Sequence, residues 1–266
     1  MSGTYEGKDG WAVSWYMDDP KKSVRVSFVD AESNTYRHVL LVYPHEKDDF
    51  KEVPIHAGGI VWYGTTLWVV DTANGIRVFD MTNIWRVDSG DNVGKNSDGT
   101  YSAQGYKYVI PQIMWYEWVP DFNFQFSYMS LDRTVQPHSM LIGEFQYDSD
   151  ADPVRMMQFD VDESRHRLVV DDDGLAKGTW AYCVNINEMQ GAVQVDGTIY
   201  ISSSNRGSIP GDIFTWTPGG SAEVTGHTPA GNEDMMYDVR TDEVFTVTER
   251  KGGRYIIKRK ISDLQP

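Results

Sequence analysis

An internal repeat constrains the fold of this sequence more than any other feature. The clearest copy occupies residues 56–64, 66–71 and 74–80, three short runs rich in β-branched and aromatic residues. Each run is ended by Gly, Asn or Asp, which is typical of antiparallel strands joined by hairpin turns. Each copy of the repeat is therefore expected to form a small antiparallel sheet.

Four further copies follow the same plan of three runs. They begin at residues 11–16, 126–130, 189–193 and 232–237 and continue through 24–29 and 37–43, 139–144 and 154–159, 198–203 and 212–216, and 243–249 and 254–258. No stretch of useful length shows the periodicity of an amphipathic helix. Five copies at blade-like spacing predict an all-β fold. We expect a single β-propeller of about five antiparallel four-stranded blades around a central channel, with six blades as the alternative.

The same repeat bears on domain organisation. A chain of 266 residues allows one large all-β domain or two small ones. Two tandem sandwiches would need a polar linker between copies, and the one loop of that length, residues 88–105, lies inside a copy. We therefore expect one propeller domain over residues 1–266. Its first and last copies show three runs each, so a strand is expected to be missing upstream of residue 11 unless residues 3–10 supply it.

The charge balance limits the classes of partner. With 24 Lys and Arg against 39 Asp and Glu, the net charge is -15, which argues against nucleic acid and against an anionic membrane surface. No apolar run approaches the ~18 residues of a membrane helix, so we expect a soluble monomer without membrane insertion. Cys183 is the only cysteine, which excludes an intrachain disulfide, and its apolar neighbours favour a buried core position.

The string His-Ala-Gly-Gly-Ile-Val-Trp-Tyr-Gly at residues 56–64 resembles the blade motif of an actinobacterial-type family of secreted propeller proteins with no assigned activity. The resemblance extends to residues 24–30, 36–42, 69–72, 75–80 and 106–112. It implies a propeller and export, and it brings no catalytic residues with it. Residues 1–6 show neither the basic nor the apolar part of a signal peptide, so the cytoplasm is the alternative location.

Polar residues at the starts of the expected inner strands are the candidate site. In a propeller, the loops that lead into these strands converge on one face, where ligands bind. We predict His56 as base or metal ligand, Glu233 as acid or metal ligand, and Gln190 as the residue that orients the substrate. An imidazole beside a carboxylate also suits a divalent cation such as calcium. Neighbouring residues expected to bind ligand are Asn232, Asp234 and Ser127. In the alternative interpretation, all these groups bond only water and neighbouring strand ends.

A second ring of polar residues closes the second strand of each copy. At Asp71 a carboxylate that caps a turn is expected, and at Glu249 a surface ion pair with the basic residues that follow. The ring comprises Asp18, Asp71, Glu144, Ser203 with Asn205, and Glu249.

Residues 108–118 are unusually aromatic. Along a strand, Trp115 and Glu117 share one face while Tyr116 and Trp118 share the other. Trp115 and Gln112 are expected to bind a sugar ring or a flat natural product, although packing between blades is the commoner use of such rings.

Motifs of several enzyme classes are missing from the sequence. It contains no Gly-x-Ser-x-Gly, no phosphate-binding loop of the NTPase type and no His-Glu-x-x-His. We therefore expect a small-molecule or glycan-processing enzyme of the lyase, hydrolase or isomerase type, metal-assisted if His56 and Glu233 bind a cation, with its site at the mouth of the channel. The alternatives are a non-catalytic propeller that binds a glycan or small molecule, and a scaffold that binds other proteins.

Overall fold

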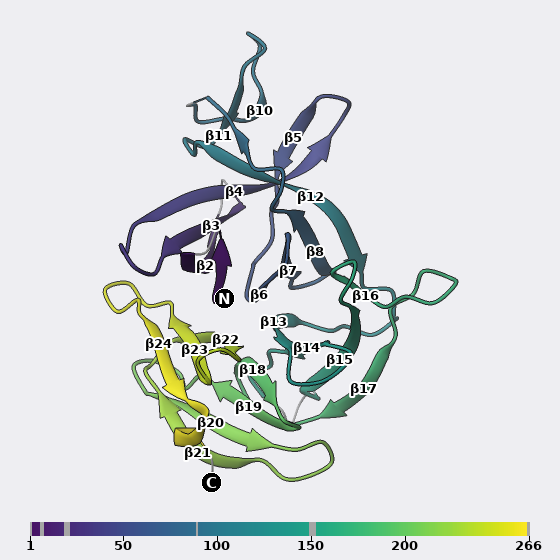
Figure 1. Ribbon diagram of the computed structural model, residues 1–266, viewed down its shortest axis with the longest axis vertical. Coiled ribbons are helices and arrows are strands. Elements are labelled where there is room, and N and C mark those ends of the chain that lie inside the picture. Colours follow the sequence, from purple (N-terminus) through teal and green to yellow (C-terminus); the bar gives the residue numbers. More distant parts are fainter. Residues whose placement is uncertain (1, 6–7, 19–21, 89, 149–152, 265–266) are drawn as a thin grey trace. The chain divides into compact units, whose positions relative to one another are not determined.

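Strands dominate the computed structural model, which describes residues 2–5, 8–18, 22–88, 90–148 and 153–264. The prediction of an all-β fold is confirmed. Within these ranges the one helix is the short 3-10 turn η1 (Ile261–Leu264). No helix in the described part of the chain has the length and apolar character needed to cross a bilayer. The strands group into two compact units, Met1–Val119 and Pro120–Pro266 (Figure 1). The single domain expected from the sequence stays a prediction.

Two antiparallel meanders, β2-β3-β4 and β6-β7-β8, build most of the first unit, and both match predicted copies of the repeat. β12 joins them into one continuous sheet. Its first half runs parallel to β4, with Val109 opposite Leu40, and its second half runs antiparallel to β8, with Trp115 opposite Arg77. The strands of this unit are β1 (Ser2–Tyr5), β2 (Lys8–Met17), β3 (Ser23–Asp30), β4 (Tyr36–His45), β5 (Asp49–Glu52), β6 (Ile60–Tyr63), β7 (Thr66–Asp71), β8 (Gly75–Asp80), β9 (Trp85–Arg86), β10 (Val93–Lys95), β11 (Tyr101–Ala103) and β12 (Tyr108–Glu117).

A small second core lies where a long loop was expected, at residues 88–105. β10 and β11 form a hairpin there, and β10 lies against β5. Phe50 of β5 stacks on Tyr101 of β11 with 5.8 Å between ring centroids, and the Lys95 amide donates to Asp49 Oδ1 at 2.6 Å. In Figure 1 the β4–β5 and β10–β11 hairpins project together from the unit. The loop expectation was wrong because the partners of these residues lie about 50 positions earlier in the chain, beyond the reach of a local pattern.

Three antiparallel sheets build the second unit. The first strand of each sheet along the chain lies innermost, and these strands, β13, β18 and β22, contact one another (Figure 1). The outer strands β17 and β24 are mostly exposed, and β21 is exposed at half of its residues. The strands are β13 (Phe126–Asp132), β14 (Ser139–Glu144), β15 (Arg155–Asp162), β16 (Arg167–Leu168), β17 (Gly178–Cys183), β18 (Met189–Val195), β19 (Thr198–Ser203), β20 (Gly211–Trp216), β21 (Glu223–Thr228), β22 (Asn232–Asp238), β23 (Glu243–Thr248) and β24 (Ile256–Lys260).

The inner strands of the second unit approach closely because one position is glycine. Tyr128, Met189 and Ile201, from three different strands, are fully buried in one cluster between the first two sheets. At Gly191 of β18, an added Cβ would lie 2.6 Å from the backbone nitrogen of Met235 in β22, closer than real Cβ contacts come. Because residue 191 is glycine, the backbone of β18 can lie directly against Met235 of β22. This contact brings the first residues of the two strands close together.

Two expectations about the edges of the sheets have different outcomes. Cys183 is exposed at the end of β17, so the expected buried position was wrong. β17 is an outer strand of its sheet, where apolar neighbours in the sequence do not imply cover. At the other end of the chain, β1 pairs with β2, with Gly3 opposite Gly10, so β1 adds a strand to the first sheet upstream of residue 11.

Candidate functional site

Each inner strand described in the second unit carries a β-bulge near its first residue. The register shifts at Ser127 in β13, at Gln190 in β18, and at Glu233 and Asp234 in β22. A bulge inserts an extra residue, re-aims the local side chains, and is common beside active sites. All four residues are candidates from the sequence, and the same backbone device redirects the chain at each of them.

A pocket of about 630 Å³ opens at this end of the second unit. Its walls come from segments that follow second strands or precede inner strands. They are Phe145 and Tyr147 after β14, Glu188 and Gln190 at the start of β18, residues 204–207 after β19, Gly231 before β22, and Glu249 and Arg250 after β23. This is the face at which the propeller interpretation places a ligand.

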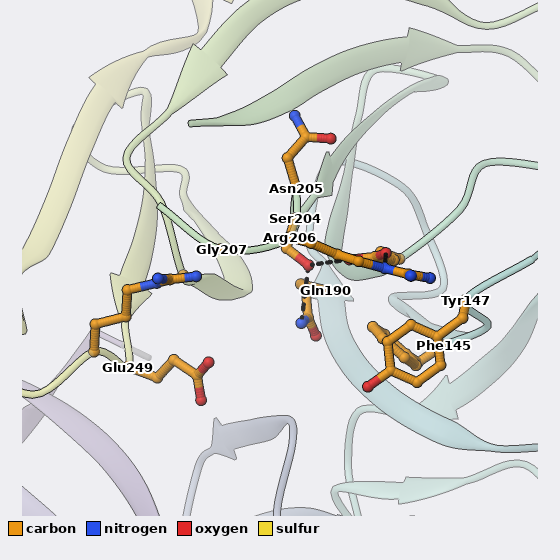
Figure 2. A pocket seen from close by; sticks show the side chains of 11 residues that line it. Phe145, Tyr147, Gln190, Ser204, Asn205, Arg206, Gly207 and Glu249 are labelled. Atoms are coloured by element: carbon orange, nitrogen blue, oxygen red, sulfur yellow. Dashed lines mark hydrogen bonds and ion pairs between the residues drawn. The ribbon is translucent and has the colours of Figure 1, made fainter. Parts of the chain in front are cut away.

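A chain of hydrogen bonds fixes the polar wall of the pocket (Figure 2). Gln190 Nε2 donates to Ser204 Oγ at 3.3 Å, and Ser204 Oγ donates to Glu188 Oε2 at 3.4 Å. Arg206 Nε donates to the other oxygen, Glu188 Oε1, at 2.8 Å. Because Ser204 and Arg206 both hold Glu188, the Gln190 amide is presented in one orientation, with its carbonyl oxygen available to a ligand.

Two aromatic rings form one side of the pocket. Figure 2 shows Phe145 and Tyr147 on one side, Glu249 on the other, and Gln190 and Ser204 between them. The two rings meet edge to face with centroids 4.8 Å apart, and the guanidinium of Arg206 lies 5.1 Å from the centre of the Tyr147 ring. Tyr147 is 62% exposed, so part of its ring is available for stacking.

A buried ion pair supports the segment that carries these rings. Glu144, the last residue of β14, is fully buried and precedes Phe145 directly. Arg155 Nε and Nη2 donate to its two carboxylate oxygens at 2.6 and 2.8 Å, and Arg155 Nη2 also donates to the Asn123 carbonyl at 2.6 Å. The two-point pairing with arginine fixes the direction in which the chain leaves β14.

Glu233 has the chemistry of an acid that holds its proton. It is half-buried at the bulge of β22. Burial raises the pKa of its carboxyl group to about 8, and the negative charges of Glu249 and Asp234 act in the same direction. At neutral pH the group is therefore mainly protonated and can donate a proton or a hydrogen bond. Its coupling to Glu249 links it electrostatically to a residue of the pocket wall.

The remaining candidates in the second unit differ in exposure. Ser127 is half-buried, whereas Asn232 is fully buried and its side-chain amide has no hydrogen-bond partner among the described residues. Gln190 lies in the pocket wall. Glu233 and Asp234 are half-buried in β22, which packs on β18 at Gly191, and they are not among the residues that line the pocket.

His56, Gln112 and Trp115 belong to the first unit, so the expected grouping of His56 with Gln190 and Glu233 stays a prediction. His56 is exposed, and its ring lies 4.3 Å from that of Tyr16 between centroids. The other two both contact Arg77. Arg77 Nη1 donates to Gln112 Oε1 at 3.0 Å, and the Arg77 guanidinium lies 4.4 Å from the Trp115 ring centre. One face of the expected Trp115 platform is therefore occupied by an arginine.

No group of three or more His, Cys, Asp or Glu side chains suited to a metal ion occurs among the residues that the structure describes. The calcium expectation concerned a pair, His56 and Glu233, divided between the two units, and it stays a prediction.

Several pocket residues were not anticipated from the sequence. Glu249 and Asn205 were included in the ring of strand-closing residues, but Glu249 was expected to form a surface ion pair and Asn205 was given no role. Tyr147, Arg206 and Arg250 lie two or three positions beyond the end of a second strand. The sequence does contain one indication of them: each follows the second strand of a repeat copy, at the end of the sheet where the inner strands begin.

The sequence matches no protein-family model and no curated protein. Solved structures similar to it include a nidogen/laminin complex, with 12% identity, a TM-score of 0.41, and coverage of 84% of this chain and 66% of the matched chain. A 6-phosphogluconolactonase candidate from Bacteroides uniformis shows 8% identity and a TM-score of 0.41 over 93% of this chain and 80% of the other. The Dos1 propeller shows 11% identity and a TM-score of 0.34 over 90% and 66%. This chain thus spans just under two thirds of the matched nidogen/laminin and Dos1 chains. Likeness at this level carries no argument about function.

Proposed function

We propose that the two units together form a single β-propeller of about five blades. The support is the number of blade-like strand sets: two meanders in the first unit and three sheets in the second, each matching one copy of the repeat. The resemblance at residues 56–64 supports the same fold and leads us to propose export from the cell.

The propeller proposal predicts the size of the chain in solution. A closed ring of 266 residues is expected to have a radius of gyration of about 18 Å, the value for one compact domain of this length. Small-angle X-ray scattering of the full chain measures it. A radius of about 25 Å or more would show two separated units and contradict a closed ring.

We propose that the pocket of the second unit binds a glycan or another small polyhydroxylated molecule. The observation that carries this proposal is the combination of aromatic rings with a fixed polar wall in one pocket, at the bulged starts of the inner strands. Rings stack on the apolar face of a sugar, while amide, hydroxyl and carboxylate groups bond its hydroxyls. Phe145 and Tyr147 supply the rings, and Gln190, Ser204 and Glu249 supply the polar groups.

We further propose that the bound molecule is processed by a reaction of the hydrolase, lyase or isomerase type, with Glu233 as the general acid. A carboxyl group that stays protonated at neutral pH can protonate a departing or rearranging oxygen. His56 is retained in this proposal as the base or cation ligand predicted from the sequence. The alternative is a propeller that binds the molecule without catalysis. The paired rings at the pocket support binding in either case and do not favour the enzyme over this alternative.

Replacing Tyr147 by alanine is expected to weaken glycan binding about tenfold, because the loss of the ring removes the stacking surface. A glycan array with the full chain identifies the bound sugars, and titration calorimetry with the best of them gives the affinity. Tyr255→Ala is the matched control, since Tyr255 is also 62% exposed in the second unit but does not line the pocket. Loss of binding in Trp115→Ala, with Tyr147→Ala unaffected, would place the site in the first unit instead.

The same bound glycans test catalysis. Incubation with the wild-type chain and mass spectrometry of the products detects turnover, and Glu233→Gln keeps the shape of the side chain without its acidic proton. Equal product formation by the two proteins would remove Glu233 from the mechanism. If the wild-type chain binds glycans but forms no product from any of them, the catalytic proposal is wrong and the non-catalytic alternative stands.

A further inference from the structure

We propose that the pocket of the second unit takes an anionic sugar, one that carries a carboxylate or a phosphate, and that Arg250 binds the anionic group. This inference rests on the proposed function of the pocket and names the class of ligand within it. It depends on the state of the charged groups in the pocket wall.

Arg250 is a cation of the pocket wall whose guanidinium has no partner among the residues that the structure describes. It lines the pocket and is half-buried, and its Nε atom is buried without a hydrogen bond. Within the described part of the chain, its guanidinium forms no hydrogen bond or ion pair. A guanidinium remains charged at all physiological pH values, and a buried donor without a partner is destabilising. An anion in the pocket would satisfy both the charge and the donors.

Gly231 leaves space for Arg250 along the pocket wall. Its backbone has a φ of +76°, and an added Cβ would lie 2.8 Å from Arg250 Cγ and 3.0 Å from Arg250 Nε. The stem of the arginine therefore lies directly over the glycine, at the point where β22 begins. A side chain at residue 231 would displace Arg250, so glycine at this position leaves the room that Arg250 needs to lie along the pocket wall.

Of the two arginines that line the pocket, Arg250 is the one that forms no ion pair in the described structure. Glu188 and Arg206 neutralise each other through their ion pair. Glu249 precedes Arg250 in the sequence but forms no ion pair with it in the described structure, and its carboxylate is suited to accept hydrogen bonds from sugar hydroxyls. The ring of Tyr147 offers a stacking face in the same pocket. Ring, acceptor and cation together match a sugar that bears one anionic substituent.

Titration calorimetry of the full chain with four probes tests the proposal: glucose, glucuronate, the methyl ester of glucuronate, and glucose 6-phosphate. The wild-type chain is expected to bind glucuronate or glucose 6-phosphate at least about tenfold more tightly than glucose, because a charge-assisted hydrogen bond is added. The methyl ester is expected to bind like glucose. The stronger of the two anions identifies carboxylate or phosphate as the group recognised.

Arg250→Gln is expected to reduce the preference for the anion about 10- to 100-fold. Arg250→Lys keeps the charge but not the planar pair of donors, and is expected to retain part of the preference. Arg165→Gln is the matched control, because the side chain of Arg165 is 75% exposed and does not line the pocket, and this variant is expected to retain all of the preference.

Two results would overturn the inference and are distinguishable from each other. Equal affinities for glucose and both anions, or a preference that survives in Arg250→Gln, would exclude an anion site at Arg250 while leaving sugar binding in place. Failure of all four probes and of every array glycan to bind would overturn the proposed function of the pocket as well.

Discussion

Replacing Arg155 by methionine is expected to lower the free energy of unfolding by about 3–5 kcal/mol, the usual cost of leaving one buried charge without its partner. Glu144 is fully buried, and both side-chain donors of Arg155 that contact its carboxylate are lost in the variant. The backbone nitrogen of Arg155 remains, at 2.9 Å from Glu144 Oε2, but it carries no net charge. Urea unfolding followed by fluorescence measures the change.

A second substitution separates loss of charge balance from loss of packing. In the double variant with Glu144→Met and Arg155→Met, no charge is left buried, so most of the stability is expected to return. Arg165→Met is the control, because its ion pair with Asp162 is exposed and is expected to contribute little. A single Arg155→Met variant as stable as the wild type would show that Glu144 is not held by this pair.

The Glu233→Gln variant is expected to be more stable than the wild type above about pH 5, by an amount that increases with pH. An unfolded Glu titrates near 4.5, whereas the folded chain keeps its proton up to about pH 8. Between these values the folded state binds more protons than the unfolded state, so wild-type stability falls as pH rises, by up to about 1.4 kcal/mol per pH unit. Glutamine has no titrating proton, so the free energy of unfolding of the Glu233→Gln variant lacks this dependence on pH.

Urea unfolding of both proteins at steps of pH from 4 to 9 measures the difference. It is expected to rise through the window between the two pKa values and to level off above the upper one. Glu223→Gln, at an exposed position of β21, is the control, and its difference from the wild type is expected to stay flat. A flat difference for Glu233→Gln would mean that the carboxyl group is solvated and ionised at neutral pH, which would also remove its role as an acid.

The sequence predicts the strands of this chain well because their signal is local. The run at residues 66–71 coincides with β7, and the run at 74–80 contains β8. The partners of β12 are not local. Its segment was correctly expected to be a strand, but nothing in residues 108–118 indicates that one half pairs with β4 and the other with β8. Such a choice depends on which surfaces become buried together.

The site is predictable in part for a related reason. Gln190 could be selected because polar residues at the start of an inner strand are visible in the sequence. The bulges were not visible, because a bulge exists only in the register between two strands. Arg250 and Tyr147 were missed because each lines the pocket only through the arrangement of several sheets in space. The local sequence around either residue does not indicate that arrangement.

The double pairing of β12 determines when the sheet of the first unit can be completed during synthesis. The contact between Leu40 and Val109 closes a loop of about 70 residues, so the sheet of the first unit is incomplete until β12 has left the ribosome. In the second unit, the pairings described join strands that are adjacent in the chain or one element apart. Those sheets can form hairpin by hairpin as they emerge. We therefore expect the two meanders of the first unit to be joined into one sheet only after β12 has been synthesised, whereas each sheet of the second unit can be completed as its own strands emerge.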